Sequence, residues 1–392
     1  MEENLHIDAL LDALRASVYA HRAELHRIPE PGNEEFKTSA YIQETLKALN
    51  IDFEVVLETG IIAYLEGSAP LRTIAFRSDI DGLSVKEAHT FEMKSQHPGY
   101  MHACGHDGHM SMLLGLAAAL KHESVTLQDN VVLIFQPAEE GPGGAERIVK
   151  GGYLQKYKVD EIYGIHLFPA IEQGKIGLCS GPMMAMTGEF DIDIRSKSAH
   201  GAMPHMGIDA VVVAGECILG LQTVVSRRIN PIQPGLLTIG RLEAGERCNV
   251  IAGSARMEGT MRAFNKSVYQ AMKAQVYAYT DGLARAHQVE IDVTYRDMYP
   301  PVTNDPELFQ YFVDLMGERC EIIEPQMISE DFSFYQEAVP GLFFFIGTRN
   351  EGLGHVAPLH SAHFNFDERA LLMGLESYLT ILNGRDSILW KA

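Results

Sequence analysis

The chain has 392 residues, which is enough for two or three domains. It is 46% hydrophobic and 21% charged, a composition typical of globular proteins with a large core. The formal net charge of −20, without any block of basic residues, argues against binding to nucleic acid or to anionic membrane surfaces. These values exclude broad classes of partner and leave the substrate open.

The N-terminal segment and the cysteines favour a cytoplasmic protein. Residues 1–25 are acidic and amphipathic, and they lack the basic and apolar regions of a signal peptide. No uncharged apolar run approaches the length of a membrane span. The five cysteines are odd in number and scattered, which is typical of a reducing compartment rather than of a disulfide framework. A thiol in such a protein is free to bind metal.

Helical and strand patterns alternate over the first part of the chain. Residues 35–49 have apolar residues at helical spacing, and another apolar helix follows His109. Short buried strands are predicted in "GIIAYLEG", "TIAFRSDIDGL", "VVLIFQPAEEGPGG" and "EIYGIHLFP". This alternation predicts an α/β domain with a mostly parallel sheet and helices on both faces. Polar residues stand where these strands end, as sites in such sheets do: Asp79, Asp81, Glu139, Glu140 and His166.

The middle of the chain has a different pattern. The predicted elements are a strand at 188–196, a helix at 207–228, strands at 235–245 and 254–264, a helix at 267–287 and a strand at 289–297. The order βαββαβ is that of a ferredoxin-like sandwich. We therefore predict a domain of residues 187–298 inserted into an α/β domain made of residues 1–186 and 299–392.

Side chains that bind metals follow these predicted strands. Divalent transition metals prefer imidazole, thiolate and carboxylate ligands, and a catalytic site keeps one position open for water. The candidate donors are Cys104, His106, His166, His360, Glu139 and Glu140. Adjacent side chains at a strand end diverge, so one glutamate can bind metal while the other serves as a base. We expect the sheet to gather these donors from distant parts of the sequence.

Each candidate alone also has an ordinary structural explanation. A single histidine at a strand end is usually a satisfied or exposed polar residue, paired glutamates usually lie on the surface, and Cys104 alone would be a small buried residue. The combination of all these residues favours a metal site. The histidines at positions 102, 109, 205, 355 and 363 are expected to have structural or supporting roles.

Seven segments, in order over nearly the whole chain, resemble one enzyme family. They are "RSDIDGL", "HACGHDGH", "FQPAEEGPGG", "IHLFP", "SAHGAMPH", "ERCNVIAGSARMEGTMR" and "MISEDFSFY". They resemble the amidohydrolase branch of the dinuclear aminoacylase/carboxypeptidase metallopeptidases. That branch includes hippurate hydrolases, auxin-conjugate hydrolases and N-acetyl-diaminopimelate deacetylases. The resemblance implies a two-metal catalytic domain and an inserted lid domain that forms dimers.

The resemblance also implies a role for individual residues. The metal ligands would be Cys104, His106, Glu140, His166 and His360. Glu139 would be the general base, and Asp81 a carboxylate that orients a ligand. His200 would reach the active site of a partner subunit, while Asn249 and Arg262 would grip the substrate carboxylate. Asp79 stands where better-known relatives have a histidine ligand, and His106 would compensate for it.

The implied reaction is metal-dependent hydrolysis of the amide bond of small N-acyl amino acids, which releases a carboxylic acid and a free amino acid. Each subunit of the expected homodimer would hold two divalent ions, which could be manganese, zinc, cobalt or nickel. Three alternatives remain at this stage. They are a dipeptidase or aminopeptidase on the same fold, a binding protein without catalysis, and an iron or copper redox enzyme that uses Cys104.

Overall fold

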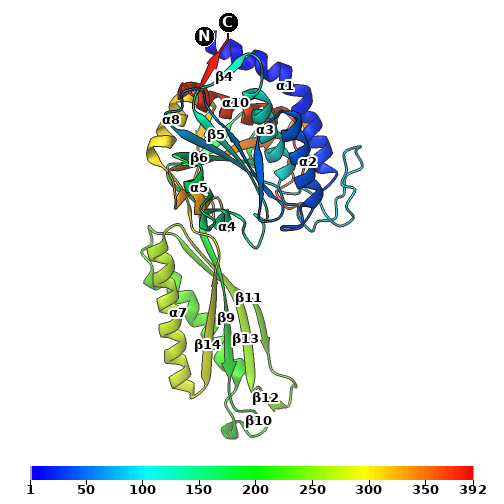
Figure 1. Ribbon diagram of the computed structural model, residues 1–392. Coiled ribbons are helices and arrows are strands. Elements are labelled where there is room, and N and C mark those ends of the chain that lie inside the picture. Colours follow the sequence, from blue (N-terminus) through cyan, green and yellow to red (C-terminus); the bar gives the residue numbers. More distant parts are fainter. Residues whose placement is uncertain (1, 392) are drawn as a thin grey trace. The chain divides into compact units, whose positions relative to one another are not determined.

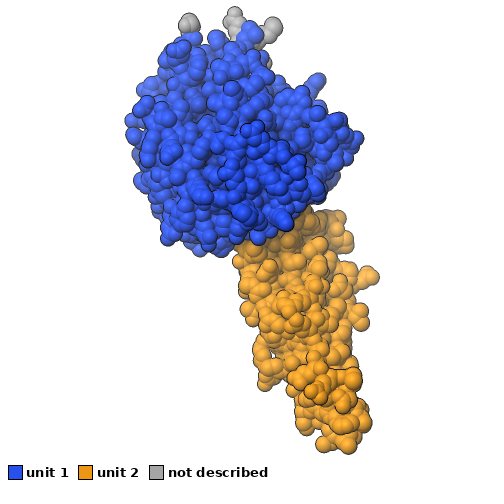
Figure 2. Space-filling view, turned by 90° about the vertical axis from the view of Figure 1, so that its right-hand side faces the viewer, with its two compact units in different colours: residues 1–181, 303–324, 334–392 blue, residues 182–302, 325–333 orange. Residues whose placement is uncertain are grey.

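The computed structural model describes residues 2–391. The chain forms two compact units, which Figure 2 shows in separate colours. The first unit contains residues 1–181, 303–324 and 334–392, and the second contains residues 182–302 and 325–333. The predicted inserted domain, residues 187–298, lies within the second unit.

The first unit is built around an eight-stranded sheet (Figure 1). In spatial order its strands are β1 (Phe53–Val56), β2 (Gly60–Leu65), β5 (Asn130–Gln136), β3 (Thr73–Asp79), β6 (Glu161–Glu172), β17 (Gly341–Arg349), β7 (Ile176–Leu178) and β16 (Cys320–Ile322). The central strands β5, β3, β6 and β17 are parallel. Antiparallel pairs join β1 to β2, β2 to β5 and β17 to β7. The predicted α/β class with a mixed, mostly parallel sheet is confirmed.

The helices of the first unit are α1 (Glu2–His26), α2 (Phe36–Ala48), α3 (His106–Leu120), α4 (Ala145–Lys150), α5 (Tyr153–Lys156), α8 (Pro306–Met316) and α10 (Arg369–Gly384). Helices α1, α2, α3, α8 and α10 pack into one apolar core with this sheet. Nearly every residue of α3 is buried, because it packs against α1 and α10 as well as against β3. A helix that is apolar on all sides needs such a central position. Strand β4 (Val125–Leu127) pairs with β18 (Ile388–Trp390) near the two termini (Figure 1).

The second unit has the predicted order βαββαβ. Its main elements are β9 (Met186–Arg195), α6 (Ala210–Thr223), β11 (Gly235–Ala244), β13 (Ser254–Ala263), α7 (Lys266–His287) and β14 (Glu290–Asp297). The antiparallel sheet has the order β11-β13-β9-β14, and α6 and α7 share one apolar core with it. The shorter elements are β10 (Ala199–His200), a 3-10 turn (Pro204–Met206), a π-helical turn (Val224–Arg228) and β12 (Val250–Ile251). Strands β8 (Gly181–Met184) and β15 (Val302–Asn304) lie where the chain passes between the two units. Short pieces that complete the chain are a 3-10 turn (Gly317–Arg319), α9 (Ser333–Gln336) and a 3-10 turn (Glu351–Leu353).

Helix α6 and the turn after it are unusually apolar. By length and composition alone, residues 210–228 would suit a membrane span. One side of α6, which includes Val213, Cys217 and Leu221, is buried in the core of the second unit. The segment is therefore a packed helix of this unit, and its remaining side is exposed.

One predicted strand boundary is wrong. The prediction ended a strand at His166, but β6 continues to Glu172. The continuation is stabilised by β17, which pairs with β6 from Gly341 to Arg349. The neighbour on the other side, β3, pairs with β6 only as far as Gly164. His166 therefore lies in the middle of its own strand but beyond the part that β3 covers.

Candidate metal centre

Cys104 and His106 come together at the start of helix α3. Gly105 between them has a φ of 90°, a left-handed conformation that glycine adopts without steric cost. His106 is the first residue of the helix. Both side chains are buried, and this tight turn presents a sulfur and an imidazole from one short segment.

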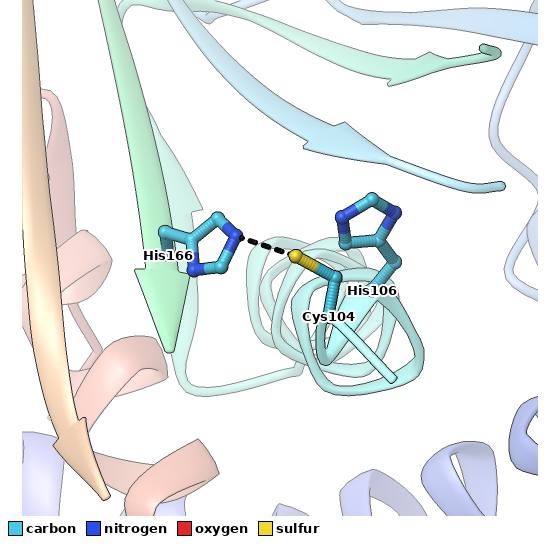
Figure 3. A group of neighbouring side chains, drawn as sticks. All are labelled: Cys104, His106 and His166. Atoms are coloured by element: carbon cyan, nitrogen blue, oxygen red, sulfur yellow. Dashed lines mark hydrogen bonds between the residues drawn. The ribbon is translucent and has the colours of Figure 1, made fainter. Parts of the chain in front are cut away.

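The thiol of Cys104 lies between two other predicted ligands. Its Sγ is 3.4 Å from Nε2 of His166 and 3.3 Å from Nε2 of His360. Figure 3 shows the thiol pointing toward the His166 ring, with the ring of His106 on the other side of the sulfur. Among the groups of donor atoms that lie within 4.8 Å of one another, three contain only candidate donors: Cys104, His106 and His166; Cys104, Glu140 and His360; and His106, Glu139 and Glu140. Two further groups extend from His106 to Asp79 and His109, and from Glu139 to Glu330 and Asp331. The structure therefore gathers all six candidate donors into one cluster.

The ring of His106 is oriented by Asp81. Its Nδ1 lies 2.9 Å from the main-chain oxygen of Asp81 and 3.3 Å from the Oδ1 of the same residue. Nδ1 therefore carries the proton and donates. Nε2 is buried and has no hydrogen-bond partner among the described residues. A metal-binding histidine has this arrangement, in which one nitrogen donates and the other keeps its lone pair free.

The ring of His166 is fixed in the same way. Its Nδ1 lies 2.7 Å from the main-chain oxygen of Leu167 and donates to it. Its Nε2 therefore keeps its lone pair, which faces the thiol of Cys104. The residue after it is also held, because the amide of Leu167 donates to Nε2 of His109 at 2.9 Å.

Glu140 and His360 face each other without forming a hydrogen bond. Nε2 of His360 lies 3.0 Å from Oε1 of Glu140. The contact is an ion pair when His360 is protonated, but its angles fall short of a well-aligned hydrogen bond to this buried oxygen. His360 has a φ of 62°, which costs a non-glycine residue about 1–2 kcal/mol. Its amide donates to the main-chain oxygen of Ala103 at 2.8 Å, which ties this loop to the turn of Cys104.

The carboxylate of Asp81 also binds the main chain of Glu139 and Glu140, which we call the acid pair. Its Oδ1 accepts the amide of Glu139 at 3.1 Å, and its Oδ2 accepts the amide of Glu140 at 3.0 Å. Asp81 therefore connects both glutamates to His106. This geometry agrees with the orienting role that the resemblance implied for Asp81, which stays a prediction until it is tested.

Asp79 and His109 form a bridge that the sequence pattern did not reveal. Asp79 accepts from Arg77 at 2.9 Å and from Nδ1 of His109 at 2.7 Å. Nε2 of His109 then accepts the amide of Leu167. His109 thus links the end of β3 to the residue after His166. Its helical position three residues after His106 was the available signal, but a buried histidine on an apolar helix has many possible partners.

The electrostatics of the cluster suit cations. Burial raises the pKa of the Cys104 thiol well above its usual range, and the carboxylates of Glu140 and Glu139 raise it further. A thiolate beside two carboxylates is stable only with positive charge nearby. Nε2 of His106 and Oε1 of Glu140 are also buried without a hydrogen bond among the described residues, and both could bind a metal. A sulfur, nitrogen and oxygen donor set of this kind fits divalent transition metals.

The remaining predicted residues lie in the second unit. His200 is exposed on β10 and pairs with Val250 of β12. Asn249 precedes β12, and its main-chain oxygen accepts the amide of Gly201 at 2.8 Å. The structure therefore brings His200 and Asn249 close together. Arg262 is half-buried on β13, where its Nη1 donates to Thr260. The predicted roles of these three residues stay predictions.

Comparison with known families decides the classification. Residues 75–384 match peptidase family M20/M25/M40. The chain belongs to this family. The predicted resemblance is thereby confirmed.

Family members with similar sequences include deacetylases and an amino acid hydrolase. The N-acetyldiaminopimelate deacetylase of Exiguobacterium sibiricum is 40% identical over 89% of this chain and 94% of its own length. The N-acetyl-L-cysteine deacetylase of Bacillus subtilis is 37% identical over 92% of this chain and 86% of its own length. The IAA-amino acid hydrolase ILR1-like 4 of Arabidopsis thaliana is 37% identical over 90% of this chain and 82% of its own length.

A similar solved structure supports the fold. It is a dinuclear metal-binding peptidase of the M20 family from Bacillus subtilis, which is 31% identical. It superposes with a TM-score of 0.82 and covers 94% of this chain and 98% of its own. The likeness spans both compact units of the M20/M25/M40 chain described here.

Proposed function

We propose that this chain hydrolyses the amide bond of N-acyl amino acids in a metal-dependent reaction that releases a carboxylic acid and a free amino acid. The observation that carries the proposal is the convergence of five potential metal ligands, one of which, Glu140, is adjacent to the proposed base Glu139. The activities named for its relatives support it, because two of them are deacetylases of N-acetylated amino acids. A dipeptidase or aminopeptidase activity on the same fold is the alternative.

The metal ligands would be Cys104, His106, Glu140, His166 and His360. The donor set and the similarity to a dinuclear metal-binding peptidase support two divalent ions, and manganese, zinc, cobalt and nickel all suit this donor set. When bound, such ions polarise a carbonyl group and lower the pKa of a water molecule toward about 7. The structural observation that supports their presence is that Nε2 of His106 and Oε1 of Glu140 are buried without a hydrogen bond among residues 2–391.

Glu139 is the residue for proton transfer. Its side chain is buried, and its main chain is held by Asp81. It accepts a proton from the attacking water and delivers that proton to the leaving nitrogen of the amide. Glu140 differs because its carboxylate points to His360 and Cys104, where it serves as a ligand.

Three residues of the second unit would complete substrate recognition. His200 donates to the oxyanion that forms on the scissile carbonyl, an effect typically worth about 3 kcal/mol per donor. Arg262 and Asn249 hold the carboxylate of the amino acid. A guanidinium suits this task because its planar fork makes two parallel hydrogen bonds.

A homodimer formed through the second unit is part of this proposal. The solvent side of α6 exposes large apolar residues: Val211 is 48% exposed, Val212 is 59% exposed and Leu219 is 74% exposed. Strand β11 is an open edge of the sheet, and such edges pair readily with another copy. A symmetric dimer is the commonest oligomer, and in it each subunit would bury this apolar face against the other subunit.

A cytoplasmic location is also proposed. All five cysteines are free, and Cys248 is exposed. A reducing compartment keeps such thiols from oxidation. The proposed thiolate ligand needs the same protection.

A substrate panel tests the function. Metal-stripped protein is reloaded with manganese, zinc, cobalt or nickel and assayed on N-acetyl and N-benzoyl amino acids and on dipeptides. We expect metal-dependent release of free amino acid from the acylated compounds. Turnover of dipeptides alone would favour the peptidase alternative. Full metal loading without turnover of any compound would favour a binding protein.

A further inference from the structure

A buried carboxylate outside the ligand set contacts the main chain just before the acid pair. Glu35 stands immediately before α2 and is 0% exposed. Its Oε1 accepts the amide of Ala138 at 2.9 Å. Its Oε2 accepts the hydroxyl of Thr59 at 2.6 Å. Both carboxylate oxygens are therefore used, and one of them holds the residue next to Glu139.

Three consecutive amides are thus held by two carboxylates. Glu35 binds the amide of Ala138, and Asp81 binds those of Glu139 and Glu140. Ala138 has a φ of 57°, in the left-handed region that L-residues with a side chain rarely adopt. Such a conformation persists only where the surroundings fix it. The bond from Glu35 is made at the strained residue itself.

The segment that carries Glu35 is itself held in place by hydrogen bonds to Glu30. Oε2 of Glu30 accepts the amides of Lys37 and Thr38 at 2.8 and 3.0 Å, which fixes the first turn of α2. The main-chain oxygen of Glu30 accepts the amide of Gly82, the neighbour of Asp81, at 2.7 Å. Residues 30–38 therefore support both carboxylates that hold the turn.

Close packing leaves this turn little freedom. A Cβ atom at Gly32 would lie 2.7 Å from the main-chain oxygen of Gly141 and 2.9 Å from the Cα of Ala138. The backbone at Gly32 thus presses directly against residues 138 and 141. A side chain there would displace the turn that carries the two glutamates.

We propose that Glu35 is a positioning residue that sets the direction of Glu139 through the amide of Ala138. This inference rests on the proposed function, because it assumes that Glu139 transfers the proton. The side-chain hydrogen bonds of Glu35 go to Ala138 and Thr59 and not to a candidate ligand. Its loss should therefore lower kcat without a matching rise in KM, and it should loosen residues 138–140.

Three substitutions at Glu35 test this proposal with full-length, metal-loaded protein. Glu35→Gln keeps an oxygen that can accept from Ala138, so we expect it to retain wild-type kcat. Glu35→Ala removes both bonds, and we expect kcat to fall roughly 10–100-fold while KM changes little. Glu35→Asp keeps the charge but shortens the reach, so it should resemble Glu35→Ala even if the alanine variant fails to fold. Glu34→Ala is the matched control, because it removes an exposed carboxylate from the same turn.

Hydrogen exchange of the backbone gives a second readout that does not need activity. In metal-free and metal-loaded protein, Glu35→Ala and Glu35→Asp should speed exchange at residues 138–140 and leave residues 188–196 unchanged. Wild-type kcat and unchanged exchange in Glu35→Asp would overturn the proposal. If the wild-type protein hydrolyses no N-acyl amino acid, the proposed function fails, and the exchange data alone decide whether Glu35 holds this turn.

Discussion

Nδ1 of His106 lies 2.9 Å from the main-chain oxygen of Asp81, so the two residues are joined by a hydrogen bond that fixes the imidazole ring. Nε2 is the nitrogen that remains for a metal. The carboxylate of Asp81 meanwhile accepts the amides of both glutamates. The carboxylate and the main-chain carbonyl of Asp81 therefore align the proposed ligand His106 with the proposed base Glu139.

Asp81→Asn should weaken metal binding. The NH2 group that replaces one carboxylate oxygen cannot accept a hydrogen bond, so one of the two bonds that hold the main chain of Glu139 and Glu140 is lost. Supporting residues of this kind typically contribute about 10–100-fold to metal affinity or activity. Competition with a chelator measures the affinity. Asp52→Asn, at an exposed position, is the control, and equal affinity in both variants would refute the role of Asp81.

Cys104→Ala should lose bound metal more than it loses folding stability. The thiol is within 3.4 Å of two imidazoles, so its removal takes one donor from a shared cluster. Cys217→Ala is the matched control, because that thiol is buried in the core of the second unit. Elemental analysis gives the metal content. Full metal content in Cys104→Ala would show that the thiol is only a core residue.

The stability of the first unit should depend on the charge of His26. Its Nδ1 lies 2.9 Å from Asp107, its Nε2 lies 3.3 Å from Glu87, and Arg22 and His102 lie nearby. Burial lowers the pKa of His26, but the charge and hydrogen bond of Asp107 and the bond of Glu87 outweigh burial and raise it to about 9. The charged ring therefore stabilises the fold fully below pH 6.5, and this stabilisation is lost as the pH rises through 9.

Chemical denaturation between pH 6 and pH 10 measures this effect. The free energy of unfolding should fall across that window by on the order of 3 kcal/mol from His26. In His26→Gln this component should disappear and leave a flatter curve. His6→Gln changes an exposed histidine of the same helix and should leave the curve unchanged. A curve for His26→Gln that parallels the wild type would contradict the assignment.

Mixing two inactive variants tests whether His200 acts across a dimer. His200→Ala and Glu139→Gln are each expected to be inactive. In a mixed dimer with shared sites, one site carries both changes and the other carries neither. Equal amounts mixed at random give about half mixed dimers, so about a quarter of wild-type activity should return. Subunit exchange without any recovery would place His200 within its own active site or outside the mechanism.

The sequence predicted much of the site because most ligands follow apolar strands. Glu139 and Glu140 come after β5, and Cys104 precedes α3, which is readable from local patterns. The end of β6 was predicted wrongly because its extension depends on pairing with β17, which lies far away in the sequence. The left-handed backbone of His360 also depends on a distant partner, the main chain of Ala103.

Supporting residues were harder to predict than ligands. Glu35 belongs to a segment with an ordinary polar pattern, and its buried bonds appear only when α2 meets the turn at Ala138. His109 was assigned a structural or supporting role, but its bridge from Asp79 to Leu167 needs three separate elements. The inserted sandwich was easier to recognise, because its strands and helices have clear and regular periods.

The most direct test of the proposed mechanism is the turnover of Glu139→Gln. The substitution keeps the size of the side chain and the main-chain bond to Asp81. It removes the carboxylate that would take the proton from the attacking water. We predict unchanged metal content by elemental analysis and a fall in kcat of at least about 10²-fold, since a general base typically contributes about 10²–10⁴-fold. Near-normal turnover of an N-acyl amino acid with full metal content would contradict the proposed role of Glu139.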